Sequence, residues 1–167
     1  VENIATLVRA AEAAGVRRIV HTSIANPSAD SPLPYYSGKA QAELVITQSK
    51  LSYAILRPTV IFGAEDVLIN NIAWLLRRFP IFAIPGAGDY RLQPIFVEDM
   101  ADLAVGLARR ADNVIVDAIG PETFTFTELV RLIRSAVRSR ALIAHVPPAL
   151  ALWMSRMVGM VVNDVVL

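Results

Sequence analysis

Residues 17–58 read RRIVHTSIANPSADSPLPYYSGKAQAELVITQSKLSYAILRP, and this stretch decides the fold. Apolar runs centred on Ile19-Val20 and on residues 53–56 each predict a short buried strand. Between them, a loop rich in Ser, Asn, Pro and Asp (residues 25–34) leads into a predicted helix over about residues 35–49. A strand, a helix and a second strand form a βαβ unit, whose strands are parallel and whose crossover is right-handed.

The rest of the sequence continues this alternation of helices and strands. Helices are predicted over residues 2–14, 66–78 and 97–110 and after a capping box of Thr125 and Glu128, with a last helix beginning near Pro147. Short strands are predicted at residues 81–84, 92–96 and 114–116. The alternation predicts an α/β fold with a mostly parallel sheet. An average sheet has about five or six strands, more than are found here, so we expect the chain to be a fragment that lacks the N-terminal strands of its sheet.

The composition excludes several classes of protein. Of the 167 residues, 54% are apolar and 19% are charged, and the mean hydropathy is +0.48, which excludes disorder. The net charge of +1 gives no reason to expect a nucleic-acid partner. Cysteine is absent, which excludes disulfides and thiolate chemistry. The most hydrophobic tract, residues 146–162, is interrupted by two prolines and Arg156. We therefore predict no transmembrane span there, but a helix that docks on a partner or on a missing part of the chain.

The sharpest chemical signal is a pair of side chains one helical turn apart, Tyr35 and Lys39. Residues at i and i+4 project from the same face of a helix. An ammonium group near a phenol lowers the pKa of the tyrosine, which can then exchange a proton with a substrate oxygen near neutral pH. The alternative is that Tyr35 and Lys39 are a surface pair without a functional role. The loop at residues 25–34 and the segment after Arg57-Pro58 both leave carboxyl ends of strands, where ligands of open α/β sheets bind, and this position favours a function.

Five stretches carry a resemblance to a known family. They are residues 14–23 (AGVRRIVHTS), Tyr35-x-x-x-Lys39 with Ala42-Glu43, Leu56-Arg57-Pro58-x-x-Ile61-Phe62-Gly63, Gly86-x-Gly88, and residues 93–101 (QPIFVEDMA). In this order they resemble the extended and atypical short-chain dehydrogenase/reductases of the NAD-dependent epimerase/dehydratase type, over residues 1 to about 110. The last stretch and the Pro-Pro helix near the end are most similar to an atypical subgroup. That subgroup includes the Rossmann-like accessory subunit of respiratory complex I and its bacterial relatives.

The resemblance implies a role for each matching residue. Tyr35 would be the catalytic acid/base, and Lys39 would hold the nicotinamide ribose and tune that tyrosine. Thr22 and Ser23 would lie near the cofactor, and Pro58, Thr59, Val60 and Ile61 would border the nicotinamide. The family's catalytic Ser or Thr aligns with Ile24, which cannot hydrogen-bond; Thr22 and Ser23 are the candidates to replace it, and we assign the catalytic role to Ser23. Leu92 stands where sugar-nucleotide epimerases carry a phosphate-binding arginine, which argues against a nucleotide-sugar substrate.

The cofactor that the resemblance implies is NAD or NADP. No Gly-rich phosphate loop lies between a strand and a helix in this sequence, and such a loop holds the pyrophosphate. We therefore expect the chain to supply the nicotinamide side of the site and to bind the cofactor poorly by itself. The implied architecture is a partial Rossmann-like doubly wound parallel sheet with a small C-terminal α/β substrate-side region. Residues 1–63 would be the C-terminal half of a dinucleotide-binding Rossmann domain, and residues 64–167 the substrate-side region, interleaved with it.

Two main functions remain open. The first is an NAD(P)-dependent oxidoreductase or epimerase/dehydratase, inactive as this fragment, in which hydride passes between nicotinamide and substrate while Tyr35 moves the proton. The alternative is a non-catalytic dinucleotide-binding subunit or redox sensor like the complex I accessory subunit; a non-functional truncation product is a third. The expected partner is a small-molecule substrate, with no nucleic acid and no transmembrane span, although association with a membrane surface or a complex is allowed. The expected location is the cytoplasm, with a membrane-peripheral or organellar location as the alternative.

Other polar residues are expected to be structural. His21 and His145 lie in no cluster with metal-ligand spacing. Glu43 is expected to form a surface pair with Lys39. The arginines at positions 77, 78, 131, 134, 138 and 140 are expected to be solvated and to interact with the C-terminal ends of helix dipoles.

Overall fold

The computed structural model describes residues 2–150 and divides the chain into two compact units. The first unit comprises Val1–Ile61 and Pro94–Gly120, and the second comprises Phe62–Gln93 and Pro121–Leu167. Each unit is therefore built from two separate segments of the chain. The division predicted from the sequence, at residue 63, stays a prediction.

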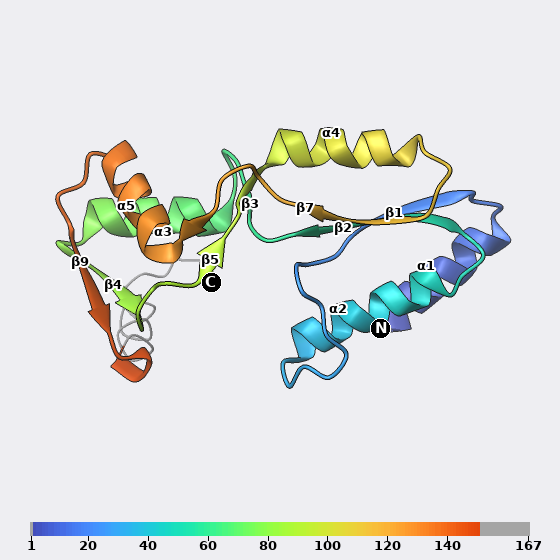
Figure 1. Cartoon of the computed structure of the whole chain (residues 1–167), viewed down its shortest axis with the longest axis horizontal. Helices are drawn as coiled ribbons and strands as arrows, with labels where there is room; N and C mark the ends of the chain where they lie inside the picture. The colour runs from blue at the N-terminus through green and yellow to red at the C-terminus, as the bar shows by residue number, and fades with distance from the viewer. Residues whose placement is uncertain (1, 151–167) are drawn as a thin grey trace. The chain divides into compact units, whose positions relative to one another are not determined.

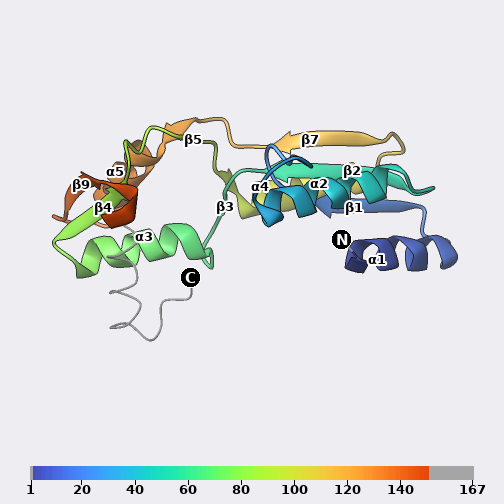
Figure 2. The ribbon, with the colours of Figure 1, turned by 90° about the horizontal axis from the view of Figure 1, so that it is seen from below.

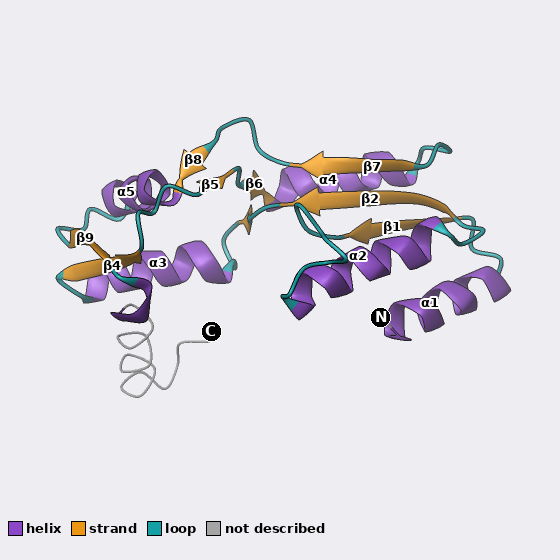
Figure 3. Cartoon of the chain, turned by 60° about the horizontal axis from the view of Figure 1, so that its bottom comes forward, coloured by secondary structure: helices purple, strands orange, loops and turns teal. Residues whose placement is uncertain are grey.

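The first unit is built on a three-stranded parallel sheet. Its strands are β1 (Arg18–Thr22), β2 (Ser52–Pro58) and β7 (Val114–Ala118), in the order β1-β2-β7. Ile19 of β1 pairs with Tyr53, and Ala54 of β2 pairs with Val114. The three arrows point the same way in Figure 3, and Figure 2 shows their order across the sheet. The predicted α/β fold with a parallel sheet is confirmed.

Helices cover both faces of this sheet, as its apolar strands require. The helices are α1 (Glu2–Ala13), α2 (Pro34–Thr47) and α4 (Val97–Ala108). Figure 1 shows α4 on one side of the sheet and α1 and α2 on the other. Side chains alternate along β2: Ala54 and Leu56 pack in the core with α4, and Ile55 packs in the core with α1 and α2. The alternation determines which polar side chains of β1 and β2 face α2.

The second unit packs two helices against a small parallel sheet. Its helices are α3 (Val67–Arg78) and α5 (Phe126–Ala136), and its sheet consists of β4 (Ile81–Pro85) and β9 (Leu142–Val146). Their shared core includes Leu76, Ile84 and Val130. The predicted capping box is confirmed: the Thr125 hydroxyl accepts from the Glu128 amide, and the Glu128 carboxylate accepts from the Thr125 amide.

Four very short strands complete the fold. β3 (Ile61–Phe62) pairs with β6 (Ile95–Phe96), and β5 (Arg91–Leu92) pairs antiparallel with β8 (Phe124–Thr125). The sequence predicted no strand at residues 142–146, where β9 lies. A helix beginning near Pro147 was predicted, and residues 148–150 are helical; its continuation lies outside the described residues.

Candidate functional site

The Tyr35/Lys39 pair lies near the beginning of α2. Pro34 occupies the first turn of this helix, where a missing amide hydrogen costs nothing. The Tyr35 side chain is 62% exposed, and its ring contacts Tyr36 edge to face. Lys39 Nζ donates a hydrogen bond to the Thr22 carbonyl oxygen, 3.2 Å away. Lys39 therefore ties α2 to the carboxyl end of β1, and the Tyr35 phenol is left open to solvent.

The segments after β1 and β2 continue side by side beyond the regular strands. The Ser23 amide donates to Leu56 O at 2.7 Å, and the Ala25 amide donates to Pro58 O at 2.9 Å. Val60 O in turn accepts from the Ile95 amide at 2.8 Å. These hydrogen bonds fix the backbone of the segment that the sequence assigned to the nicotinamide.

The side chains at this sheet edge differ in accessibility. Pro58 is buried and Val60 half-buried, while Thr22, Thr59 and Ile61 are exposed. Thr22, Ser23, Lys39 and Pro58 thus lie at the same edge of the sheet. Within the described residues, no hydrogen bond joins Tyr35 to Lys39. The roles assigned to these residues stay predictions.

Ser23, the residue assigned to the catalytic serine role, is only 3% exposed. Its hydroxyl lies near enough to the Glu43 carboxylate to lower the pKa of that group. No acceptor or donor in the described part of the chain, however, meets the geometry of a hydrogen bond with Ser23 Oγ. The Ser23 hydroxyl therefore points into the protein beside α2, not to solvent.

Glu43 corrects an expectation, because it is buried and pairs with Arg57 instead of forming a surface pair with Lys39. Arg57 Nε and a terminal guanidinium nitrogen donate to the two Glu43 carboxylate oxygens at 3.0 and 2.6 Å. The Glu43 and Arg57 side chains are 7% and 30% exposed. Burial by itself would raise the pKa of Glu43, but the hydrogen bonds from Arg57, the nearby Ser23 hydroxyl and the charges of Arg57 and His21 outweigh it and hold the pKa below its ordinary value.

His21 completes this buried polar cluster. It follows Ile19 on the face of β1 that packs toward α1 and α2. Burial and the nearby positive charge of Lys39 lower the pKa of His21, and the negative charge of Glu43 opposes them. The His21 Nε2 atom is buried with no hydrogen-bond partner in the described residues. Strand alternation is the feature of the sequence from which this cluster could have been predicted. His21 and Arg57 lie on the same sheet face as Ile19 and Ile55, and α2 covers that face.

The described residues contain no candidate metal site and no candidate membrane span. No group of three or more His, Asp or Glu side chains in residues 2–150 could hold a metal ion. Likewise, none of the helices in that range is long and apolar enough to cross a membrane.

The fold is that of the extended short-chain dehydrogenase/reductases. A UDP-N-acetylglucosamine 4-epimerase from Methanobrevibacter ruminantium superposes with a TM-score of 0.75 at 18% identity, covering 88% of this chain and 55% of the epimerase. A dTDP-4-dehydrorhamnose reductase from Bacillus anthracis, in complex with NADP, superposes with a TM-score of 0.74 at 14% identity, covering 86% and 55%. A further structure, of MoeE5 with UDP-glucose, contains NAD. Proteins of this fold thus bind NAD or NADP, which confirms the predicted cofactor at the level of the fold. No family model matches the chain.

The sequence itself is related to a particular group of subunits. It is 30% identical over 165 residues to the rat mitochondrial NADH dehydrogenase [ubiquinone] 1 alpha subcomplex subunit 9, covering 92% of this chain and 41% of that protein. The Arabidopsis thaliana subunit of the same name is 26% identical over 160 residues, covering 93% and 40%. The chain thus spans about two fifths of the length of these relatives. Together with the fold, these relatives confirm the predicted family resemblance.

The relatives overturn one prediction and bear in part on another. The sequence predicted a small-molecule substrate as the partner and only allowed association with a complex. That prediction is wrong, because the relatives are named as subunits of NADH dehydrogenase, which is an assembly. The same names place the relatives in mitochondria, which agrees with the organellar alternative for the location and not with the cytoplasm.

Proposed function

We propose that this chain is part of a dinucleotide-binding accessory subunit of an NADH dehydrogenase-type complex, one that holds NAD(H) or NADP(H) without turning over a separate substrate. Its relatives are such subunits by name, which supports membership of an assembly. Their mitochondrial location makes an organelle the proposed location. The residues that would hold the nicotinamide side of the cofactor lie between the carboxyl ends of β1 and β2, the edge where open α/β sheets bind nucleotides.

The observation that carries the proposal is the burial of the Ser23 hydroxyl, the group assigned to the catalytic serine role. Catalysis of the predicted kind needs a second hydroxyl that orients the substrate oxygen beside the tyrosine. The Ser23 hydroxyl is buried and lies near Glu43, and Ile24 carries no hydroxyl. A site with an exposed phenol and a fixed ammonium can still hold a ribose, because the ammonium donates hydrogen bonds to ribose hydroxyls. Holding a cofactor is therefore better supported than turning over a substrate.

The residues present fit the nicotinamide half of a dinucleotide. Lys39 is already held at the strand end by Thr22 O, so its ordering on binding costs little further entropy. The backbone of residues 58–60 is fixed by hydrogen bonds to Ala25 and Ile95. When bound, the cofactor would supply a redox-active ring at this edge. The chain's own residues would bind its ribose through Lys39 and border its ring with the segment Pro58 to Ile61.

The experiment measures binding of NADH and NADPH by calorimetry, to this chain and to the longest product that its gene encodes. Lys39→Ala is expected to weaken binding by about tenfold, the effect of losing a charge-assisted hydrogen bond worth roughly 1.4 kcal/mol. Lys50→Ala is the matched control, since Lys50 is an exposed lysine on the same unit. Equal affinity of Lys39→Ala and Lys50→Ala, or no binding by the longest product, would refute the assignment.

The second candidate function is catalysis by Tyr35, which its exposure at the sheet edge favours. This function predicts oxidation or reduction of a substrate by the longest gene product and a loss of about a hundredfold or more in Tyr35→Phe. Under the main proposal, Tyr35→Phe binds NADH as tightly as the unchanged protein, and neither protein oxidises it across a panel of carbonyl substrates.

A further inference from the structure

Two helix ends and two strand beginnings meet at one end of the second unit. The Ser139 hydroxyl, just after α5, donates a hydrogen bond to Leu76 O in the last turn of α3. The Leu142 amide at the start of β9 donates to Pro80 O, 2.8 Å away and directly before β4. The C-terminal ends of α3 and α5 therefore lie together, next to the first residues of β4 and β9.

Positive charge collects at this end. Arg77 and Arg78 occupy the last turn of α3, and Arg138 and Arg140 follow α5; all four are exposed. Among residues 2–150, none of these four side chains makes a hydrogen bond or an ion pair. The carboxylates that flank the same helices, those of Asp66 and Glu128, lie at the opposite, N-terminal ends. Helix dipoles favour this separation, and its result is a cationic surface without a counter-charge.

Apolar side chains lie open beside these arginines. Ile81 and Leu142 are register partners at the start of β4 and β9, and they are 51% and 66% exposed. Paired residues of neighbouring strands point to the same face. Phe82, the next residue of β4, points to the other face and is buried in the core. The Ile81–Leu142 pair is thus an exposed apolar pair on the solvent face of this small sheet.

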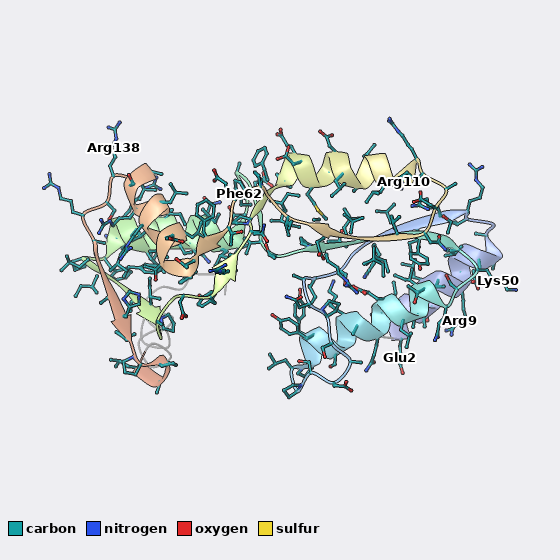
Figure 4. The ribbon with its side chains drawn as sticks, viewed as in Figure 1. Glu2, Arg9, Lys50, Phe62, Arg110 and Arg138 are labelled. Carbon is teal, nitrogen blue, oxygen red and sulfur yellow. The ribbon has the colours of Figure 1, made fainter. Side chains whose placement is uncertain are left out.

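Arg138 occupies a backbone position that favours glycine. Its φ is +53°, the left-handed region in which a side chain is unfavourable. The Ser139 amide donates to Arg134 O and the Arg138 amide to Ser135 O, both at 3.0 Å, which is the Schellman pattern with Arg138 at C′. Glycine there would be more stable. An arginine in this position costs folding stability, and its side chain extends away from the ribbon (Figure 4).

We propose that Arg77, Arg78, Arg138, Arg140, Ile81 and Leu142, here called the arginine surface, dock a protein segment that carries carboxylates beside aliphatic side chains. Charge complementarity requires an anionic partner. Exposed aliphatic side chains at the same end of the unit as several arginines match the composition of protein interfaces, in which Arg is enriched and Lys depleted. All four cations of the surface are arginines, whose planar forks bind carboxylates in bidentate fashion. The strained Arg138 fits a residue retained for binding, since strain of this kind concentrates at functional positions.

The test uses a labelled helical peptide with Glu and Leu on one face, titrated with this chain while fluorescence anisotropy is followed. The same peptide with Gln in place of Glu is the uncharged probe. We expect the Glu peptide to bind at low salt and to weaken as salt rises, because the contacts are ionic. Arg138→Gly with Arg140→Ser should weaken binding by about tenfold, and Leu142→Ser by about threefold.

Two controls keep the outcome decisive. Arg9→Ser with Arg17→Ser removes the same charge from exposed positions of the first unit and should change the affinity by less than about twofold. Arg138→Gly is expected to fold at least as stably as the unchanged chain, so a loss of binding is not a loss of structure. Equal weakening by both double variants, no binding of the Glu peptide by the unchanged chain, or binding to phosphatidylglycerol vesicles in preference to the peptide would each overturn the proposal.

Discussion

Arg57→Met separates the contributions of the buried ion pair beneath the candidate site. The substitution keeps an unbranched side chain of similar reach but removes the charge that Glu43 faces. Removing one partner from a fully buried pair costs about 3–5 kcal/mol, because the other charge is left buried and unpaired. Glu43 is 7% exposed but Arg57 is 30% exposed, so solvent already screens part of the interaction. We therefore expect unfolding in urea at about pH 7 to show a loss of roughly 2–3 kcal/mol.

The pH dependence of this loss tests the explanation. In the unchanged chain the pKa of Glu43 is held below its ordinary value of 4.5, so the stability that the pair contributes is present above that pH and disappears as pH falls through the lowered pKa. Without Arg57, burial, the largest influence on Glu43, dominates and raises its pKa. The variant's carboxyl is then protonated at moderately acidic pH, where it carries no buried charge. The difference in stability between the two proteins should therefore shrink between about pH 7 and pH 4.

Two further proteins complete the experiment. Glu43→Leu combined with Arg57→Met replaces the pair with apolar side chains and is expected to recover most of the lost stability. Arg110→Met removes an arginine from the exposed pair with Asp112, whose side chains are 55% and 51% exposed, and should cause no measurable change. If Arg57→Met alone were as stable as the unchanged chain, or if its deficit were the same at both pH values, Glu43 would not be a buried charge that depends on Arg57.

Three other substitutions test the packing, capping and strain in the structure by urea unfolding. Gly120→Ala would place a Cβ 2.0 Å from the Pro94 carbonyl oxygen, so we expect a loss of about 1–3 kcal/mol, and an unchanged midpoint would contradict this contact. Thr125→Ala removes the N-cap of α5 and should cost about 1 kcal/mol, whereas Thr125→Ser should retain most of the stability. Arg138→Gly should stabilise the chain by about 0.5–1 kcal/mol by relieving a positive φ; a destabilised variant would mean that the Arg138 side chain makes a contact that offsets the strain.

The elements that the sequence predicted are those whose pattern is local. Val8 lies on the apolar stripe from which α1 was predicted, and Met100 on the one from which α4 was predicted, and both are buried. Strand β9 was missed because His145 interrupts its apolar pattern. The structure explains this residue: the His145 ring nitrogen Nε2 lies 3.1 Å from the Thr127 hydroxyl, so the polar side chain has a hydrogen-bond partner. No local rule anticipates a hydrogen bond between residues that far apart in sequence.

The candidate site was predicted in part for the same reason. The helical spacing of Tyr35 and Lys39 is a local feature, and so are the strand ends at Thr22 and Pro58. In the structure Lys39, Thr22 and Pro58 lie at the same edge of the sheet. The pairing of Glu43 with Arg57 depends on which face of β2 packs against α2. Single-sequence spacing put Glu43 beside Lys39, where an i, i+4 pair forms most readily. Glu43 is buried, and a buried carboxylate needs a partner with good hydrogen-bond geometry. Arg57 provides it by donating to both carboxylate oxygens.

The alternation of side chains at the end of β1 bears on the proposal that the site does not turn over a substrate. Side chains alternate along β1, so His21 and Ser23 face α2, while Thr22 between them is exposed. A hydroxyl at position 23 is therefore drawn into the buried cluster, where it supports the Glu43 carboxylate, and is not available beside the Tyr35 phenol. Positions 22 and 24 lie on the outer side: Thr22 is exposed, and the isoleucine at position 24 offers no hydrogen bond. Lys39 is in place to bind a ribose, and the serine assigned to catalysis is buried away from solvent, so the proposed holding of a dinucleotide is favoured over its turnover.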